Sequence, residues 1–404
     1  ENTANAIIKN CYNIGNVTGT DKRIGGIIGR NASKFVENCY NTGTVTSTGE
    51  NTDTVGGVCG LNSSNYLINC YYLADSETDK LDGTTFKTAA EFASGEVAYL
   101  LNGSTPGNAN IFRQNLDNGE PTDATPVLDS AHDVVYEGKL CTSGTGYTND
   151  EDSTSEIHAW DDNGFCKNDD THYQPAVKNA ENVYEISNAG QLYWFASEVN
   201  GGNCVNAVLT KDIVVNKGDV AGCEGTKTEG WRDWTPINGT YYISTFDGQG
   251  HVIRGLYFND TRVGNIGLFS NLNKEGKIQN VGLENSYFRG VAYVGGICAY
   301  SNGTIENCYN AGTITAEYDY VGGLVANNFG SIVNCYNTGN ITADKDTGGG
   351  VAAWNNSGGT IKNCYNSGTL TGGSMNGVVQ INDKDGTVEN CYYRSDSETD
   401  DFDG

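Results

Sequence analysis

The stretch that decides the fold reads Gly303-Thr-Ile-Glu-Asn-Cys308-Tyr-Asn-Ala-Gly312-Thr-Ile-Thr315. Its centre, Asn-Cys-Tyr, occurs seven times, with cysteines at positions 11, 39, 70, 308, 335, 364 and 391. Successive copies are 28 and 31 residues apart in a first block and 27, 29 and 27 apart in a second. A near-constant period of this size is typical of proteins built from stacked repeats, and unrelated hairpins would not produce it.

A glycine-rich apolar step precedes the later copies, for example Gly25-Gly-Ile-Ile-Gly29 and Gly322-Gly-Leu-Val325. Each unit thus contains short β-prone stretches separated by Gly or Asn. Stacking would bury Ile305, Ile314 and Leu324 against their equivalents one repeat away, with paired strands about 4.8 Å apart. We therefore predict an all-β fold of parallel β-solenoid blocks, and the usual handedness of β-crossovers predicts right-handed coils.

The repeated Asn, Cys and Tyr are predicted to form ladders along the stack. Asn amides can hydrogen-bond from coil to coil, Tyr rings can stack, and Cys can fill the interior. The pattern does not decide which of them faces inward. The predicted ladder residues are Asn10, Cys11, Tyr12, Asn38, Cys39, Tyr40, Asn69, Cys70, Tyr71, Asn307, Cys308, Tyr309, Asn334, Cys335, Tyr336, Asn363, Cys364, Tyr365, Asn390, Cys391 and Tyr392.

Composition excludes several partners. The 404-residue chain carries 24 Lys and Arg against 50 Asp and Glu, a formal net charge of −26. Such a chain repels nucleic acid and anionic lipid, so neither is an expected partner. It has no apolar stretch of about 18 residues, so no membrane span is expected. Its 24 Tyr and 12 Phe, with regular apolar positions, argue against disorder.

The glycine-rich steps followed by Asn-Cys-Tyr-Asn-x-Gly resemble the GLUG-motif repeats of large bacterial surface proteins. The stretch from Tyr184 to Leu256 resembles the segment that leads into such an array. The resemblance implies an extracellular protein of the bacterial cell surface, in an adhesin, a filament or an appendage to a secreted enzyme. It carries no shared catalytic residues.

Five segments are expected: the last coils of a first solenoid at 1–83, a capping helix at 84–103, a small irregular β linker module at 104–180, a second capping helix at 181–204 and a second solenoid at 205–404. Thr88 with Glu91, and Asn188 with Gln191, mark the two helix starts. Such helices cover exposed strand edges. The outer coils lack such covers, which predicts either a longer chain or head-to-tail joining of copies into a filament.

Two acidic strings are candidate calcium sites. Asp75, Asp79 and Asp82, and likewise Asp396, Asp400 and Asp403, place carboxylates at i, i+4 and i+7. Hard cations take several oxygen ligands from one flexible loop, which makes calcium the one candidate cofactor. The alternative is a solvated acidic turn that ends a solenoid.

Four cysteines outside the repeats are candidates for disulfides, pairing Cys141 with Cys166 and Cys204 with Cys223. The alternative for the first pair is zinc, with His158 and His172 as further ligands. The repeat cysteines, together with Cys59 and Cys298, are expected to be reduced and buried.

No nucleophile elbow, zinc-protease motif or P-loop occurs in the sequence, so we expect no catalytic residues and no enzyme. The predicted function is an extracellular structural repeat protein that forms a rigid filament or stalk segment and associates with copies of itself. The alternative is a cell-surface adhesin that binds glycans or host proteins. Trp194, Trp231, Trp234 and Trp354 are its candidate sugar platforms.

Overall fold

The computed structural model describes residues 6–20, 22–32, 35–49, 54–64, 66–73, 84–103, 110–116, 123–141, 145–151, 156–167, 169, 171–240 and 242–394. The calcium candidates at 75–82 and 396–403 lie outside these residues. The chain divides into two compact units, Glu1–His158 (unit 1) and Ala159–Gly404 (unit 2).

Unit 1 begins with a short parallel β-solenoid. Equivalent strands pair in register, so that Cys11 lies opposite Cys39 and Cys39 opposite Cys70. One sheet contains β1 (Ile8–Asn13), β5 (Val36–Asn41), β9 (Leu67–Leu73) and β10 (Thr85–Lys87). The other faces are the pairs β2 (Val17–Gly19) with β6 (Val45–Ser47), β3 (Ile24–Gly25) with β7 (Val55–Gly56), and β4 (Ile28–Asn31) with β8 (Cys59–Asn62).

The segment after this solenoid forms two short helices, α1 (Ala89–Ala93) and α2 (Glu96–Leu101), where one capping helix was predicted. Gly95 separates them because its backbone is left-handed, with φ 89°. The predicted capping box is present: Thr88 accepts from the Glu91 amide, and Glu91 accepts from the Thr88 amide. Unit 1 ends in a three-stranded sheet of β11 (Tyr136–Leu140), β12 (Thr145–Thr148) and β13 (Glu156–Ile157).

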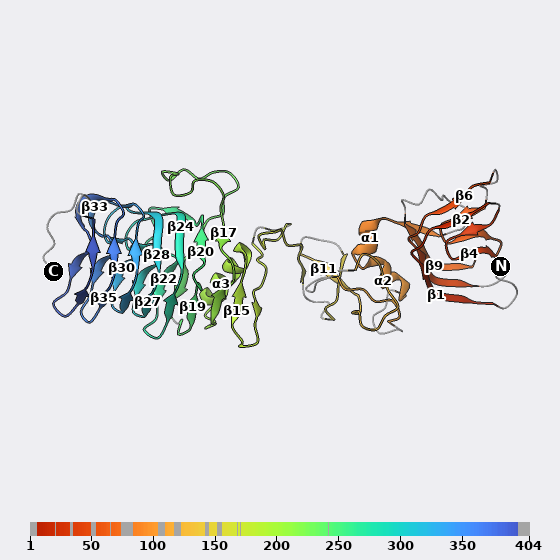
Figure 1. Ribbon diagram of the computed structural model, residues 1–404, viewed down its shortest axis with the longest axis horizontal. Helices are drawn as coiled ribbons and strands as arrows, with labels where there is room; N and C mark the ends of the chain where they lie inside the picture. Colours follow the sequence, from red (N-terminus) through yellow and green to blue (C-terminus); the bar gives the residue numbers. More distant parts are fainter. Residues whose placement is uncertain are drawn as a thin grey trace. The chain divides into compact units, whose positions relative to one another are not determined.

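Unit 2 is a longer parallel β-solenoid (Figure 1). Within the described residues it has three sheets. The nine-stranded sheet contains β14 (Val177–Lys178), β15 (Tyr184–Ile186), β16 (Ala207–Leu209), β19 (Thr245–Asp247), β23 (Lys277–Gln279), β27 (Thr304–Glu306), β31 (Ser331–Val333), β35 (Thr360–Lys362) and β39 (Thr387–Glu389). The six-stranded sheet contains β18 (Ile237–Gly239), β22 (Phe269–Leu272), β26 (Cys298–Ser301), β30 (Val325–Asn328), β34 (Ala352–Asn355) and β38 (Val379–Asn382). The twelve-stranded sheet contains β17 (Ile213–Val214), β20 (Val252–Arg254), β21 (Tyr257–Asp260), β24 (Gly282–Gly290), β25 (Val294–Gly295), β28 (Tyr309–Ala316), β29 (Val321–Gly322), β32 (Tyr336–Asn337), β33 (Ile341–Gly349), β36 (Tyr365–Asn366), β37 (Leu370–Asn376) and β40 (Tyr392–Tyr393).

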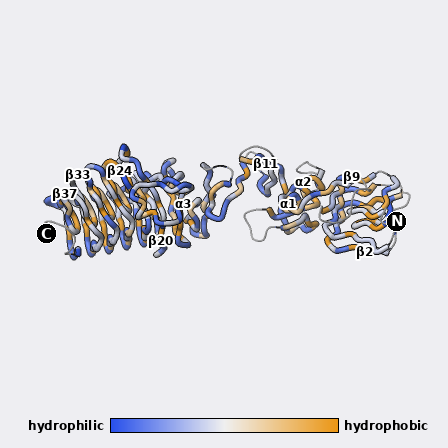
Figure 2. Tube along the Cα trace, turned by 90° about the horizontal axis from the view of Figure 1, so that it is seen from above, coloured by the Kyte–Doolittle hydropathy of each residue, from blue (hydrophilic) through white to orange (hydrophobic). Residues whose placement is uncertain are grey.

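The core of unit 2 is a column of identical or similar apolar residues, and polar residues alternate with them around each coil (Figure 2). Ile278, Ile305, Ile332 and Ile361 lie opposite one another in successive strands, and all four are fully buried. The predicted second capping helix is α3 (Ala189–Asn200), which begins at Asn188 and packs Phe195 against Phe246. Stacking of like residues therefore gives the solenoid its interior, as the repeat predicted.

The predicted linker module at 104–180 is divided between the two units. Its first part packs on the cap of unit 1, where Gln114 donates a hydrogen bond to the Phe92 carbonyl. Its last part packs on α3, where Phe165 contacts Tyr193 with ring centroids 5.4 Å apart. These long-range contacts leave no trace in local sequence pattern, which explains the difference.

The asparagine before each repeat cysteine forms a corner of the coil. All seven have left-handed backbone, with φ between 49° and 57°, and Asn280 adopts the same conformation one coil earlier. Asparagine tolerates this conformation better than other non-glycine residues. The side chains also form the predicted amide ladder, in which each Nδ2 donates to the preceding coil, as from Asn334 to Asn307 at 3.3 Å.

A second amide ladder, not predicted, lies inside the coil at the asparagine that follows Cys-Tyr in five of the seven copies. Asn310 Nδ2 donates to Asn337 Oδ1, and Asn337 Nδ2 donates to Asn366 Oδ1, both at 2.8 Å. These side chains are buried. The missing side chain of Gly323 makes room for Asn337, because a Cβ there would lie 2.6 Å from its amide carbon. This contact explains the second glycine of the Gly-Gly step.

We predict that Asn337→Ala destabilises the protein by about 1–3 kcal/mol, because the buried Asn310 amide and the buried Asn366 oxygen each lose one of two hydrogen bonds, and keep only those to Gly312 and Gly368. Thr338→Ala is the matched control, since Thr338 is exposed and adjacent, and should change stability by less than about 0.5 kcal/mol. Urea unfolding followed by circular dichroism measures both. Equal effects of the two substitutions would contradict a stabilising role for the buried amide ladder.

Candidate functional site

The structure places the repeat cysteines inside the coil and the repeat tyrosines outside. Cys308, Cys335 and Cys364 are buried, and each thiol donates to the carbonyl two residues before it, at 3.1–3.2 Å. Burial raises the pKa of the Cys335 thiol well above its usual value, which disfavours the reactive thiolate. These thiols are placed as core fillers.

The tyrosines of unit 2 stack face to face on the outside of the twelve-stranded sheet. Tyr309, Tyr336 and Tyr365 have centroids 4.8 and 4.9 Å apart and ring planes within 2° of parallel. Ring faces that contact each other are not available to a sugar, which stacks on an open face. The ladder is therefore a structural element along its length, and only its outermost ring has a face free for another contact.

In unit 1 the last two rings of the equivalent tyrosine ladder, Tyr40 and Tyr71, are covered. Tyr40 is fully buried, and its ring lies 5.5 Å from Phe92 and 6.0 Å from Phe112. Its hydroxyl donates to the Pro126 carbonyl. The helices α1 and α2 and the chain that follows them thus form the cover that the first solenoid was predicted to have.

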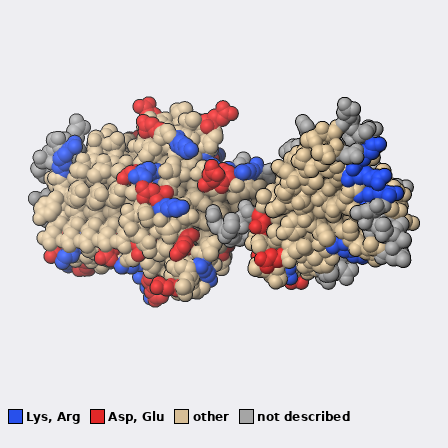
Figure 3. Space-filling model, turned by 45° about the vertical axis from the view of Figure 1, so that its right-hand side comes forward, with Lys and Arg blue, Asp and Glu red and all other residues tan. Residues whose placement is uncertain are grey.

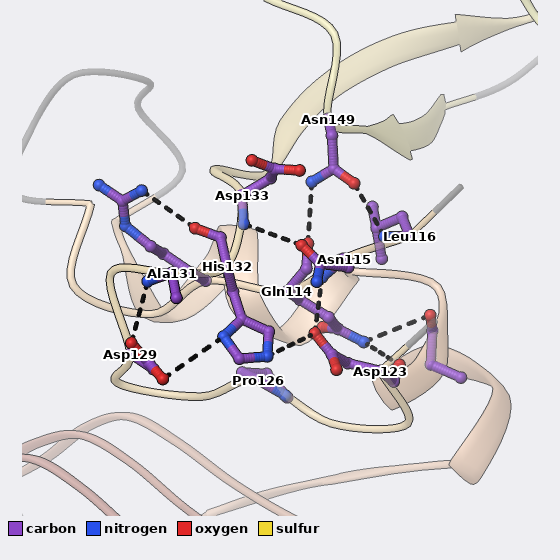
Figure 4. Close-up of polar contacts among 12 residues, drawn as sticks. Gln114, Asn115, Leu116, Asp123, Pro126, Asp129, Ala131, His132, Asp133 and Asn149 are labelled. Atoms are coloured by element: carbon purple, nitrogen blue, oxygen red, sulfur yellow. Dashed lines mark hydrogen bonds and ion pairs between the residues drawn. The ribbon is translucent and has the colours of Figure 1, made fainter. Parts of the chain in front are cut away.

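A polar network holds that cover in place (Figure 4). His132 lies between two carboxylates, with Nε2 3.5 Å from Asp123 and Nδ1 3.9 Å from Asp129. Gln114 donates to the carbonyls of Phe92 and Asp123, both at 2.9 Å, and Asn149 donates to the Gln114 carbonyl at 2.8 Å. The amides bridge three backbone segments, so we read this cluster as a positioning network for the cover.

The predicted disulfide residues stay predictions. Cys141 belongs to unit 1 and Cys166 to unit 2. Of the alternative zinc ligands, His158 belongs to unit 1 and His172 to unit 2. In unit 2, Cys223 packs beside Val220, Tyr257 and Tyr287, whereas Cys204 is exposed. The structure does not bond these two sulfurs to each other.

A cluster of charges that sequence reasoning missed crosses three coils of unit 2. Arg254 pairs with Asp212 and with Glu284, both at 2.8 Å, and Tyr309 donates to Glu284 at 2.6 Å. The hydrogen bond from Arg254 lowers the pKa of Asp212. Spacings of 42 and 30 residues hid the cluster in the sequence. A guanidinium bonded to both carboxylates makes them a clamp between coils.

A groove of about 580 Å³ opens on unit 2 beside the six-stranded sheet. Polar groups of its lining include Asp233, Asn238, Asp260 and Asn271, and its apolar side is formed by Phe258, Val263 and Ile266. The Arg262 side chain beside Asp260 lowers the pKa of that carboxyl to about 2, so it is ionised at neutral pH. Amides and carboxylates beside an apolar wall suit a ligand that carries many hydroxyl groups.

An aromatic stripe continues from the groove along the six-stranded sheet. The ring centroid of Tyr293 lies 4.8 Å from that of Tyr300 and 4.9 Å from that of Tyr320. The ring centroids of Tyr320 and Trp354 are 5.5 Å apart. Asn271 of the groove is directly opposite Tyr300 in the paired strands. Tyr293 and Tyr320 have left-handed backbone, with φ of 55° and 60°, which costs a bulky residue about 1–2 kcal/mol. The coil keeps these rings on one surface despite that cost.

Of the four candidate tryptophans, Trp354 alone belongs to this stripe, and it donates to Asp383 at 3.0 Å. Trp234 is buried in the core, Trp194 packs on Tyr184, and Trp231 packs on Tyr257. The surface seen in Figure 3 shows a broad uncharged area over the later coils of unit 2, with charged side chains along its margin.

The fold and the ladders define the class: this is a parallel β-solenoid repeat protein. Residues 318–342 match the GLUG motif. The chain therefore carries the motif that its repeats resemble. Residues 318–342 contain Tyr320 of the aromatic stripe and Asn337 of the buried ladder.

Comparison with curated proteins finds a similarity to halomucin of Haloquadratum walsbyi (strain DSM 16790 / HBSQ001), 35% identical over 74 residues. The match covers 18% of this chain and 1% of halomucin. Among solved structures, a Bacteroides ovatus protein described as a "putative immunoglobulin A1 protease" matches 53% of this chain and 76% of its own, at 24% identity and a TM-score of 0.41. Among the described residues, the helices are too short or too polar to cross a lipid bilayer.

The capping box of α1 predicts a pH dependence. Hydrogen bonds from Thr88 and Lys87 lower the pKa of Glu91 to about 2. The ionised Glu91 carboxylate therefore stabilises the folded state fully at any pH above the usual glutamate pKa. This stabilisation is lost as the pH falls through the lowered pKa. Glu91→Gln keeps a capping side chain without a charge. We expect the Glu91→Gln variant to lose less stability between about pH 4.5 and pH 2 than the unchanged protein loses. Thermal unfolding across this range measures it, and parallel curves would contradict the assignment.

Proposed function

We propose that this chain is a rigid structural segment of an extracellular, cell-surface repeat protein. The observation that carries the proposal is the unbroken coil stack of unit 2, in which each coil bonds to the next through three sheets and the amide ladders. The GLUG motif and the similarity to halomucin support the surface location. A net charge of −26 favours a hydrated surface that resists collapse onto neighbours.

In this role the number of coils determines the length of the segment. The register of the strands repeats every 27 residues between Tyr309 and Tyr336, and each strand pairs with its equivalent in the next coil. A coil therefore adds one strand spacing, about 4.8 Å, to the stack. Such a segment acts as a spacer that holds attached domains away from the cell.

We expect that three extra copies of residues 309–335, inserted in tandem after Val333-Asn-Cys335, lengthen unit 2 by about 14 Å and leave the protein folded. Small-angle scattering measures the maximum dimension, and circular dichroism measures the β content. The matched control is a Gly-Ser insert of equal residue number at the same place, which cannot continue the ladders.

Equal dimensions for the two inserts would overturn the spacer role. The surface location is tested separately by protease treatment of intact cells of the source organism, which should release peptides of this chain. Release that occurs only after lysis would overturn the location.

A second candidate function, carbohydrate binding, is favoured by the groove and the adjoining aromatic stripe. Carboxylates and amides of the groove, such as Asp260 and Asn238, can hydrogen-bond sugar hydroxyls. Tyr300 lies on the coil next to Asn271, and Trp354 lies two coils beyond Tyr300. Tyr300, and the face of Trp354 that does not stack on Tyr320, can contact the apolar faces of sugar rings. The two surfaces are contiguous, which suits an extended glycan chain lying along the stack.

For this candidate we expect saturable binding on a glycan array, weakened about tenfold or more by Trp354→Ala. Tyr336→Phe is the control, because Tyr336 lies in the stacked ladder on another sheet and keeps its ring. Binding that is absent, or that is lost equally in both variants, would contradict a carbohydrate site here.

A further inference from the structure

Both arrays end in a copy of the repeat that differs from the others at one position. In five copies the residue after Cys-Tyr is the asparagine of the buried ladder, as in Asn41 and Asn366. In the last copy of each block it is a tyrosine, Tyr72 or Tyr393. The strand register places Tyr72 opposite Asn41 and Tyr393 opposite Asn366. The tyrosine therefore ends the buried amide ladder in both solenoids.

The two terminal coils are built in the same way. The ring of Tyr72 lies over Gly57, and the ring of Tyr393 lies over Gly377: a Cβ on either glycine would come 2.3 or 2.1 Å from the ring carbon Cγ. In an inner coil the equivalent glycine, such as Gly350, faces the Asn366 amide instead. An aromatic ring thus replaces the amide and presents an apolar end to whatever lies on the coil.

In unit 1 that end is occupied. Strand β10 adds in parallel to β9, with Thr85 opposite Tyr71 and Phe86 opposite Tyr72. The helices α1 and α2 then turn back over the outer ladder, where Phe92, Val97 and Leu101 pack with Tyr40 and Tyr71. Tyr71 and Tyr72 are left 8% and 7% exposed.

In unit 2 the equivalent tyrosines are exposed among the described residues. Tyr365, the counterpart of Tyr40, is 42% exposed, and Tyr392 and Tyr393 are 69% and 40% exposed. Strands β38, β39 and β40 are the last in their sheets in the part of the chain that the structure describes. Three sheet edges next to exposed aromatic rings form a surface to which a further strand can add.

We propose that this end of unit 2 is a docking site for a polypeptide segment with the design of residues 84–103. Its strand pairs in parallel with β40, and its short amphipathic helices cover Tyr365 and Tyr392. The occupied copy in unit 1 identifies the occupant, because the same coil there holds a segment of this kind. The proposal is independent of whether this protein acts as a spacer or as an adhesin.

One position distinguishes the two surfaces and predicts selectivity. In unit 1 Lys87 lies opposite Leu73, and its ammonium pairs with Glu91 and Glu96. The residue of unit 2 that corresponds to Leu73 is Arg394. Like charges opposite each other in paired strands repel, so the occupant of unit 2 should carry an acidic or neutral residue where unit 1 has Lys87.

The test appends a second copy of residues 84–157 directly after Gly404, so that the copy includes Phe112 and the network from Gln114 to Asn149 that holds the cover in unit 1. Tyr393–Gly404 and Tyr72–Gly83 contain the same number of residues, so the copy starts at the same distance from its coil as in unit 1. The amides of Tyr392 and Arg394 already donate to the carbonyls of Cys364 and Asn366 in the preceding coil, so the amide of Tyr393 faces the outer edge. We expect amide hydrogen exchange at Tyr393 to slow about tenfold or more, because strand addition gives this amide a partner. The neutral Lys87→Gln change in the appended copy removes the like charge opposite Arg394 without placing a third carboxylate beside Glu91 and Glu96, and should slow the exchange further.

The control is the appended copy with Phe86→Ala and Phe92→Ala, which keeps length and charge but loses the covering rings. Exchange that is unchanged by the appended copy, or slowed equally by the control, would overturn the proposal. The proposal would also be overturned if the unextended chain showed protection from exchange that rises with protein concentration and disappears in the Ile8→Asp variant. That result would identify the first coil of a second copy as the occupant.

Discussion

The left-handed asparagine at the corner of each coil is the constraint on which the rest of the structure depends. Asn307, Asn334 and Asn363 turn the chain from the nine-stranded sheet into the twelve-stranded sheet at the same place in every repeat. A β-branched residue there would be strained, and a glycine would lose the amide that bonds to the next coil. Because the corner recurs in register, the cysteines, tyrosines and isoleucines above and below it come into register too.

The sequence predicted the coil well and its orientation poorly. The period, the Gly-Gly steps and the Asn-Cys-Tyr strings were enough to predict stacked parallel strands and an amide ladder. They could not show that Cys308 faces inward and Tyr309 outward, because the left-handed residue before them interrupts the simple alternation of a strand. The buried ladder at Asn310 and Asn337 was missed for a different reason. Asparagine is usually exposed, and these side chains are buried here because their amides hydrogen-bond to each other.

Features that join distant positions could not be read from local pattern. The groove combines residues from Asp233 to Asn271, and the Arg254 clamp joins Asp212 to Glu284, so both exist only once the coils are stacked. The capping box at Thr88 and Glu91 was readable because both partners lie within one turn. The split into α1 and α2 had a signal in Gly95, whose left-handed backbone ends the first helix.

The same repeat is used in two surroundings, and the comparison separates what the coil needs from what its neighbours add. Tyr40 and Tyr365 occupy equivalent positions, yet one is fully buried and the other 42% exposed. The difference comes from the chain beyond the coil, through Phe92 and Phe112 in unit 1. A stacked tyrosine is therefore compatible with either environment, which lets one repeat serve in the middle of a stack and at a covered end.

The direction of the hydrogen bonds has a mechanical consequence. Because strands run across the stack, the bonds between coils point along its axis, and tension on the last coil loads the bonds of one interface at a time. Such a coil peels away while those beneath it stay closed, and the 27 residues between Cys364 and Cys391 would release about 90 Å of extended chain. A stack of this kind yields under tension in steps, and dissipates work at each one without losing its attachment.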